Sequence, residues 1–451
     1  MKLRKLLTLL LCSIMLMAAC GAPAGDAGSS GAADSEAAAD EGGEKEPYVV
    51  TLAGYRTGPY QHTGTPLGNG MQDMATYIND QGGVDGWPIK LMEIETGYDT
   101  PRGVEAYERG KTEGNMVTFI PFSTGTTYAV TPRAFEDKMP ILQTGYGISA
   151  AASGEAFPYN FLLSPTYWTV EAASTQFIVD QEGGEEAMAG KKIALVYADI
   201  DYGRETIPLM ETLAEELGFE LQKFPVEWPG LEQTAVWSDI AGRSEPDWVI
   251  LRMWGQSTVV SLQEAARVGF PMSNIIGCPW SPTDQDIDLA GAEIAKGVRA
   301  NYWASSGTDI PIIATMLSDV HEADKGYGPI EEVGTQLYNR GVFNMGAAAL
   351  AIQLSGEEFG HPLTSEQVVW GYEHLTPEAI ADAGLTGLVP AELATSESDH
   401  MGSPYAQMHE FDGEKMVPIG EWTVAYEDIV QGLIEEAANA FKENNPELYE
   451  Q

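Results

Sequence analysis

The chain is poor in cysteine, in histidine and in basic residues. Its 451 residues include 3 Cys and 6 His, and 24 Lys and Arg stand against 67 Asp and Glu, for a formal net charge of −43. So few cysteines exclude a disulfide-dense scaffold. The excess of negative charge excludes unaided binding to nucleic acid or to an anionic membrane surface, because both need a cationic protein surface.

The sequence also lacks the common catalytic and metal-binding motifs. It contains no Cys-x-x-Cys, no His-Glu-x-x-His, no Gly-x-Ser-x-Gly and no phosphate-binding Gly-x-x-x-x-Gly-Lys loop. The glycines of Gly68-Asn69-Gly70 do not complete a dinucleotide-binding fingerprint, so we expect them in a loop and at the entry to a helix. These absences predict a protein that is not an enzyme and needs neither a metal nor a cofactor.

The first twenty residues resemble a bacterial export signal. Three basic residues precede an apolar run at 6–17, which at about a dozen residues is too short to span a bilayer. Small residues lead up to Cys20, as in a lipoprotein signal. We therefore predict a signal peptide at 1–19 and lipidation of Cys20. The alternative is an ordinary signal peptide cleaved near Ala19, with Cys20 as an incidental thiol.

A flexible linker is expected after the signal. Residues 20–47 are rich in Gly, Ala, Ser and acidic residues, and such a composition cannot bury a core. With Cys12 removed and Cys20 lipidated, only Cys278 remains, so the mature chain can form no intrachain disulfide. No later apolar run is long enough to span a membrane. The sequence predicts an extracytoplasmic protein attached to the bacterial membrane through its lipid only.

Strand and helix patterns alternate from residue 48 onward. Apolar runs predict strands, which fall at 48–54, 88–95, 192–197, 221–226, 248–253 and 274–277. Apolar residues at helical spacing predict helices, which fall at 71–78 after a loop at 57–68, at 207–217 and at 259–268. This rhythm is typical of α/β proteins and predicts two lobes, each a doubly wound parallel sheet.

The loops that follow the strands are rich in aromatic and hydroxyl side chains. Ligands of open parallel sheets bind beyond the carboxyl ends of the strands, so these loops are candidates for a binding site. The side chains in question are Tyr55, Thr57, Tyr60, His62, Thr63, Phe122, Ser123, Thr124, Thr126, Thr127, Tyr128, Thr144, Tyr146, Ser149, Tyr202, Trp254, Trp280, Ser281, Tyr302 and Trp303.

Several segments resemble the type I periplasmic-binding-protein family, in its branch of branched-chain amino acid ABC transporters. They are Thr57-Gly58-Pro59-Tyr60, the helix ending at 78–86 and the strand and Tyr-Gly loop at 191–203. The resemblance extends in order over residues 48–425. It implies two α/β lobes joined by a three-segment hinge, with lobe one at 48–165 plus 304–400 and lobe two at 166–303 plus 401–451.

The resemblance also implies a set of ligand-binding residues. Ser123 and Thr124 fall near the family's contact to the ligand carboxylate, and Tyr146 and Gly147 near its second contact. In lobe two, Tyr202 and Trp254 match aromatic contacts. Trp280 and Ser281 occupy the place where amino-acid binders carry a carboxylate for the ligand's ammonium, and the nearest acid is Asp284. The ligand class therefore stays open between a branched-chain amino acid, an amide and an aromatic acid.

Taken together, these features predict a monomeric solute-binding protein of an ABC importer. Closure of the lobes would capture a small organic molecule and present it to a permease whose ATPase subunits drive import. One alternative is an extracellular ligand-sensing subunit of a signalling receptor. A second alternative, a secreted hydrolase, lacks a recognisable nucleophile or metal motif in the sequence.

Overall fold

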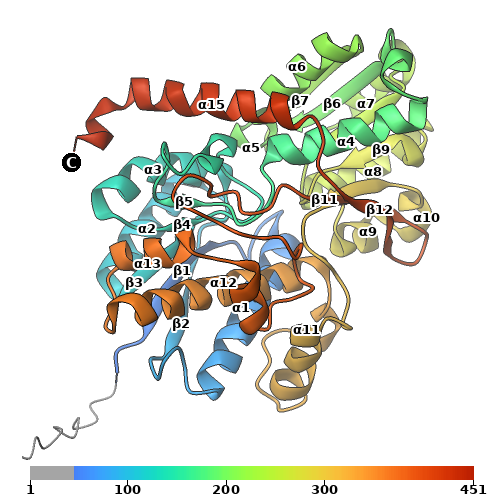
Figure 1. Ribbon diagram of the computed structural model, residues 1–451. Helices are drawn as coiled ribbons and strands as arrows, with labels where there is room; N and C mark the ends of the chain where they lie inside the picture. The colour runs from blue at the N-terminus through green and yellow to red at the C-terminus, as the bar shows by residue number, and fades with distance from the viewer. Residues whose placement is uncertain (1–44, 451) are drawn as a thin grey trace, which may run out of the picture. The chain divides into compact units, whose positions relative to one another are not determined.

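Two β-sheets organise residues 45–450, the part of the chain that this computed structural model describes (Figure 1). The predicted signal peptide and Cys20 lie outside the described residues. Within residues 45–450, no helix is both long enough and apolar enough to cross a membrane.

The first sheet has five strands in the order β2-β1-β3-β4-β5, and all neighbouring strands run parallel. Its strands are β1 (Tyr48–Gly54), β2 (Ile89–Glu95), β3 (Met116–Ile120), β4 (Ile141–Leu142) and β5 (Asn160–Phe161). The register pairs Tyr48 with Ile89 and Gly54 with Glu95, so β1 and β2 end at the same edge.

The second sheet has seven strands in the order β12-β11-β10-β9-β8-β6-β7. Its strands are β6 (Lys192–Ala198), β7 (Glu220–Val226), β8 (Trp248–Arg252), β9 (Ile275–Gly277), β10 (Arg299–Tyr302), β11 (Ala406–Phe411) and β12 (Met416–Thr423). Strands β6 to β10 are parallel, whereas β11 and β12 are antiparallel. The expectation of an entirely parallel sheet is wrong at this edge, because a short turn joins β11 to β12 and a turn of that length allows only antiparallel pairing.

Fifteen α-helices cover the sheets. The first eight are α1 (Gln61–Asp80), α2 (Thr100–Glu113), α3 (Thr124–Asp137), α4 (Tyr167–Glu182), α5 (Asp201–Arg204), α6 (Ile207–Leu217), α7 (Thr234–Asp239) and α8 (Gln256–Val268). The others are α9 (Asp284–Ala290), α10 (Ala292–Ala295), α11 (Pro311–Thr315), α12 (Gln336–Phe359), α13 (Ser365–Glu373), α14 (Pro377–Asp382) and α15 (Glu427–Asn444). These counts refer to residues 45–450.

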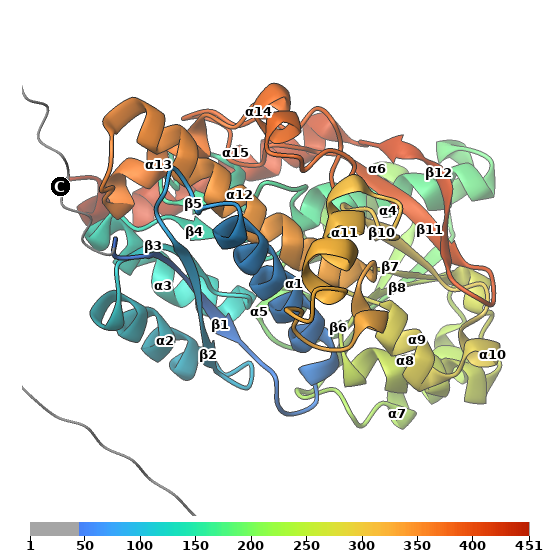
Figure 2. The same ribbon diagram turned by 90° about the horizontal axis from the view of Figure 1, so that it is seen from below.

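Helices pack on both faces of each sheet, as in a doubly wound fold. Figure 2 shows α1 and α12 side by side on one face of the first sheet, with α2 and α3 on the other. The strands alternate accordingly, since successive side chains point to opposite faces. In β6, Ile193 and Leu195 join the core under α4, α6 and α15, while Ala194 and Val196 join the core under α8 and α9.

Helix α1 begins at Gln61, so the predicted loop at 57–68 is wrong over most of its length. The glycines of this segment serve close helix packing. A Cβ atom on Gly70 would lie 2.1 Å from the Tyr338 carbonyl oxygen, and one on Gly341 would lie 2.1 Å from the Leu67 carbonyl oxygen. Helices α1 and α12 thus cross with their backbones in contact, and this packing outweighs the low helix propensity of glycine.

The chain passes between the two sheets more than once. It runs from β5 in the first sheet to β6 in the second, returns to α12 and α13 on the first, and then enters β11. Helix α15 contacts both groups, with Ile434 in the core of the second sheet and Ala438 packed on residues near β5. The boundaries of the two predicted lobes stay a prediction, because α15 packs against elements of both sheets.

Candidate functional site

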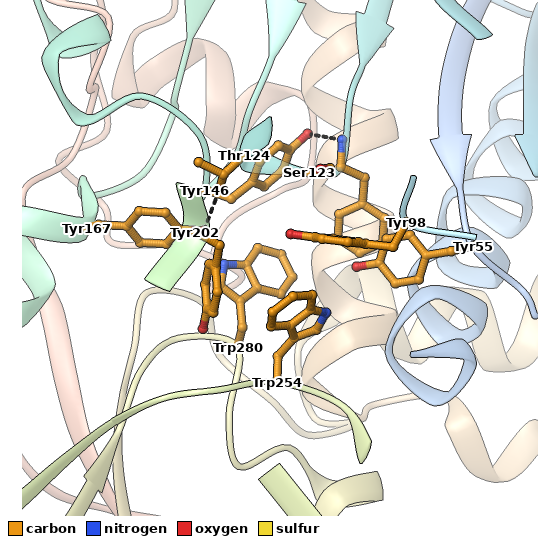
Figure 3. Close-up of a pocket in the computed structure, with 10 residues that line it drawn as sticks. Tyr55, Tyr98, Ser123, Thr124, Tyr146, Tyr167, Tyr202, Trp254 and Trp280 are labelled. Carbon is orange, nitrogen blue, oxygen red and sulfur yellow. Dashed lines mark hydrogen bonds between the residues drawn. The ribbon is translucent and has the colours of Figure 1, made fainter. Parts of the chain in front are cut away.

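Aromatic side chains line a pocket of about 250 Å³ between the two sheets (Figure 3). Ten residues line it, and all but Ser123 and Thr124 are aromatic. The ten are Tyr55, Tyr98, Phe122, Ser123, Thr124, Tyr146, Tyr167, Tyr202, Trp254 and Trp280. None of these ten carries a carboxylate or a basic group.

The ends of parallel strands supply most of these side chains. Tyr55 follows β1, Phe122 and Ser123 follow β3, Trp254 follows β8, and Trp280 lies in the loop after β9. The strand-end rule for open α/β sheets therefore accounts for the location of the pocket.

Six of the nine residues predicted to bind ligand line this pocket. They are Ser123, Thr124, Tyr146, Tyr202, Trp254 and Trp280. The six come from five separate segments of the chain and from both sheets, so the fold brings together side chains that are up to 157 positions apart in the sequence. Their contact with a ligand stays a prediction.

The other three predicted residues, Tyr60, Gly147 and Ser281, do not line the pocket. Tyr60 stacks behind Trp254, with ring centres 4.6 Å apart, and its hydroxyl donates to the Pro229 carbonyl at 2.6 Å. A Cβ atom on Gly147, whose φ is 90°, would collide with the Gln143 side chain, so this glycine shapes the loop. Ser281 is buried, with its hydroxyl 3.7 Å from Cys278 Sγ.

Two lining residues, Tyr98 and Tyr167, were missed by the sequence analysis. Tyr98 follows β2, so the strand-end rule could have found it. Tyr167 is the first residue of α4. The strand before it, β5, has only two residues, and a strand that short leaves no recognisable pattern.

Two of the lining tyrosines, Tyr202 and Tyr146, use their hydroxyls in hydrogen bonds to the backbone. The Tyr202 hydroxyl donates to the Met253 carbonyl at 3.1 Å, and the Tyr146 hydroxyl donates to the Leu142 carbonyl at 3.0 Å. Burial raises the pKa of both phenols well above the usual value, so both stay neutral. The buried Nε1 of Trp254 has no hydrogen-bond partner within residues 45–450.

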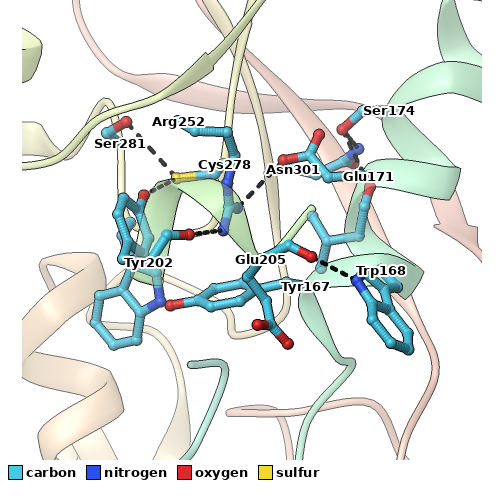
Figure 4. A network of polar contacts seen from close by, with 12 residues as sticks. Tyr167, Trp168, Glu171, Ser174, Tyr202, Glu205, Arg252, Cys278, Ser281 and Asn301 are labelled. Carbon is cyan, nitrogen blue, oxygen red and sulfur yellow. Dashed lines mark hydrogen bonds and ion pairs between the residues drawn. The ribbon is translucent and has the colours of Figure 1, made fainter. Parts of the chain in front are cut away.

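A buried ion pair lies behind two of the rings (Figure 4). Arg252 Nη1 lies 3.2 Å from Glu171 Oε1, and both side chains are fully buried. The Arg252 guanidinium also lies 4.2 Å from the centre of the Tyr167 ring and 4.7 Å from that of Tyr202. Burial raises the pKa of Glu171 to about 7, because desolvation of the carboxylate outweighs the attraction of Arg252.

Hydrogen bonds join the two sides of the pocket. Trp280 Nε1 donates to the Gly145 carbonyl at 2.7 Å, and the amide of Ser149 donates to the Glu205 carboxylate at 2.8 Å. His62 Nε2 lies 2.9 Å from Asp286 Oδ1. Each bond connects a segment beside the first sheet with one beside the second, so the structure is a closed form.

A larger hollow of about 610 Å³ adjoins the pocket. It shares Tyr98 and Ser123 with the pocket and is bordered by the carboxylates of Asp99 and Asp201. It provides a polar approach to the aromatic pocket. Among residues 45–450, no cluster of His, Cys, Asp and Glu is arranged to hold a metal ion.

Comparison with known proteins identifies the fold and the family. A model of the family described as "Periplasmic binding protein" matches residues 47–414. A crystal structure from the Pseudomonas fluorescens group, described as an ABC transporter permease, is 36% identical, with a TM-score of 0.80 over 89% of this chain and 98% of that chain. A search of the curated proteins finds no match.

More distant structures share the fold. A branched-chain amino acid ABC transporter protein from Thermus thermophilus with bound valine is 20% identical, with a TM-score of 0.73 over 86% of this chain and 99% of that chain. A solute-binding protein from R. palustris in complex with benzoate is 15% identical, with a TM-score of 0.66 over 84% of this chain and 97% of that chain.

Two α/β sheets that enclose a pocket between them define a type I solute-binding protein. The chain belongs to the periplasmic binding protein family. The resemblance seen in the sequence and the predicted fold class are thereby confirmed. Members of this family are extracytoplasmic solute-binding proteins of ABC transporters and not enzymes.

Proposed function

We propose that this protein captures a compact organic solute in the aromatic pocket and delivers it to an ABC permease. The observation that supports the proposal is the origin of the pocket walls. Tyr55, Phe122 and Tyr146 come from the first sheet's side, while Tyr202 and Trp254 come from the second. A solute between them would touch both sides only in the closed form.

The ring-lined wall suits a solute with an apolar body and few polar groups. Aromatic faces cover apolar surface, and the unpaired Trp254 Nε1 offers a hydrogen bond to a polar end group. The candidate classes are a branched-chain amino acid, an amide and an aromatic acid. Valine and benzoate, the ligands of two structures with this fold, belong to the first and third classes.

Capture would proceed by closure of the lobes at 48–165 plus 304–400 and at 166–303 plus 401–451. The solute shifts the population towards the closed form by the contacts that it makes only there. The bonds from Trp280 to Gly145 and from Ser149 to Glu205 stabilise this form without any solute. The closed lobes then present a surface that a permease can distinguish from the open form.

The same proposal includes the protein's location and partners. Cys20 would carry the lipid that attaches the protein to the bacterial membrane, and residues 20–47 would act as the tether. The protein would work as a monomer with a permease and its ATPase subunits.

A thermal-shift screen of the mature chain tests solute binding. The panel holds leucine, valine, isovaleramide, benzamide, benzoate and 4-methylpentanoate. A solute present at 100 times its Kd adds about 2.7 kcal/mol to the free energy of unfolding, so a true ligand raises the Tm clearly. The matched control is Trp254→Ala, which should lose the shift. A shift that is the same in Trp254→Ala places the ligand elsewhere and contradicts the proposed pocket.

A further inference from the structure

A second buried arginine, Arg340, packs behind a different ring of the pocket from those that Arg252 contacts. It lies in the second turn of α12, near the start of that helix, and is fully buried. Its guanidinium lies 4.8 Å from the ring centre of Trp280, a pocket residue, and 4.7 Å from that of Trp303. Within residues 45–450, no carboxylate lies within ion-pair distance of Arg340, and its three side-chain nitrogens have no hydrogen-bond partner.

Two further unpaired donors belong to the same cluster. Asn344 follows Arg340 by one turn of α12, and its Oδ1 accepts a bond from the Thr144 hydroxyl at 2.7 Å, which leaves its Nδ2 as a buried donor without a partner in the described chain. The indole Nε1 of Trp303 is likewise unpaired and lies against Gly145, the residue after Thr144. Arg340, Asn344 and Trp303 are therefore neighbouring buried residues that each carry an unpaired donor.

Burying these donors without acceptors is energetically unfavourable unless an anion binds beside them. Arginine keeps its proton in proteins, so the charge cannot be avoided by deprotonation. Burial lowers the pKa of Arg340 to about 9, which measures how unfavourable the charged form is at this position. The ring faces of Trp280 and Trp303 attract the cation but supply no hydrogen-bond acceptor. Donors without acceptors select an anion.

We propose that Arg340, Asn344 and Trp303 form a binding site for a small monovalent anion, separated from the aromatic pocket by Trp280. Two sources offer this chemistry. One is the carboxylate of the captured solute, which would reach the site if the Trp280 ring shifts, and this source rests on the proposed function. The other is a free halide ion, which would bind whether or not a solute is present.

If the bound anion is the carboxylate of the captured solute, the anion site also determines which class of solute binds. None of the ten pocket residues carries a carboxylate, so the ammonium of an amino acid would have no counter-charge there. A carboxylate without an ammonium would instead find a partner in Arg340. The site then favours 4-methylpentanoate over leucine and benzoate over benzamide.

Bromide tests the free-ion source. Raising bromide at constant ionic strength, with gluconate as the replaced anion, should increase the Tm of the mature chain by a few degrees. Arg340→Gln should remove this increase. Arg299→Gln is the control, because Arg299 also lies over two aromatic rings but is paired with Glu410 far from the pocket residues. Crystals soaked in bromide should show anomalous scattering beside the Arg340 guanidinium, a result that does not depend on the variant folding.

Solute affinities test the other source. Arg340→Gln should weaken 4-methylpentanoate or benzoate at least tenfold and leave benzamide unchanged, and bromide should compete with the carboxylate. Either source supports the anion site. The site is overturned if bromide neither scatters beside Arg340 nor changes the Tm, and carboxylate and amide affinities respond equally to Arg340→Gln. If bromide binds but no solute of the panel does, the anion site stands and the proposed function fails.

Discussion

Arg252 and Arg340 are two fully buried arginines that pack against different rings of the aromatic pocket, and they differ in their counter-charge. Arg252 has Glu171 at 3.2 Å, whereas Arg340 has no carboxylate partner within residues 45–450. Both guanidiniums lie against pocket rings at similar distances. The charge of Arg252 is thus balanced within the protein, whereas that of Arg340 needs an anion from solution as its counter-charge.

The difference arises from the elements that hold the two arginines. Arg252 ends β8 and faces α4, which carries Glu171 one turn after its start. Arg340 sits in a helix whose buried stretch is built from Ala, Gly, Leu and Asn, and the next acid along it is Glu357, more than four turns away. The buried acid of the neighbouring helix α1, Asp73, accepts a hydrogen bond from Tyr338 and forms no ion pair with Arg340.

Breaking the pair at Arg252 should give the largest effect. Arg252→Met leaves Glu171 buried without a partner, so we expect the free energy of unfolding to fall by about 3–5 kcal/mol. The loss should be larger at pH 8.5 than at pH 6, because the lone carboxyl can take up a proton at the lower pH. Thermal or urea unfolding at the two pH values measures this. A loss below 1 kcal/mol at pH 8.5 would contradict the role of the pair.

Removing a ring of the pocket should affect binding more than folding. Trp254→Ala and Tyr202→Ala each delete a buried aromatic wall, for an expected loss of about 1.5–3 kcal/mol in solute affinity, or roughly 10–100-fold in Kd. Calorimetric titration with the best ligand of the screen measures this. Trp370→Ala, a stacked tryptophan outside the pocket, should leave Kd unchanged. Unchanged affinity in both pocket variants would remove the assignment of the site.

Neutralising Glu171 should make Arg252 resemble Arg340. The pKa of Glu171 is about 7 in the folded chain against 4.5 for an ordinary glutamate, so the folded state binds more protons between these values. This group therefore makes stability fall as the pH rises through that window. Glu171→Gln should remove this pH dependence, so the variant should gain stability relative to wild type as the pH rises through that window, and it should introduce a new stabilisation by bromide. The difference between the Tm curves of variant and wild type is the readout, and identical curves would refute it.

Arg340→Met should have the smallest effect on stability. In a buffer without small anions, removing an unpaired buried charge should change the free energy of unfolding by less than about 1 kcal/mol, or increase it. The contrast with Arg252→Met, measured in the same buffer, is the sharpest test of the comparison. A loss as large as that of Arg252→Met would mean that Arg340 has a partner within the protein.

Much of the fold could be predicted from the sequence because burial imposes strong patterns. The strands predicted at 48–54, 192–197 and 248–253 agree with β1, β6 and β8 to within one residue at each end, since continuous apolar runs mark strands buried on both faces. The helix predicted at 207–217 is α6, which Gly218 ends in a left-handed conformation. The hairpin of β11 and β12 was not predicted, because most of β12 is exposed and its pattern is weak.

The site was predicted only in part, for reasons that lie in tertiary structure. Strand ends indicate where a pocket forms, so Trp254 and Trp280 were found. Tyr60 was assigned to the pocket, but its ring is the second layer behind Trp254. Arg340 carried no signal at all, since an arginine in a helix is normally exposed, and only the three-dimensional packing shows that it is buried without a partner.

The position of α15 restricts where the molecule can bend. One half of this helix packs on the second sheet through Val430 and Ile434. Its other half is held near β5 by Ala438 and Phe441, and the Phe441 ring lies tilted against that of Phe157 with ring centres 4.4 Å apart. A helix that packs on both sheets is displaced least when the axis of their relative rotation lies close to it. Opening of the pocket should therefore rotate the two sheets about a line near α15.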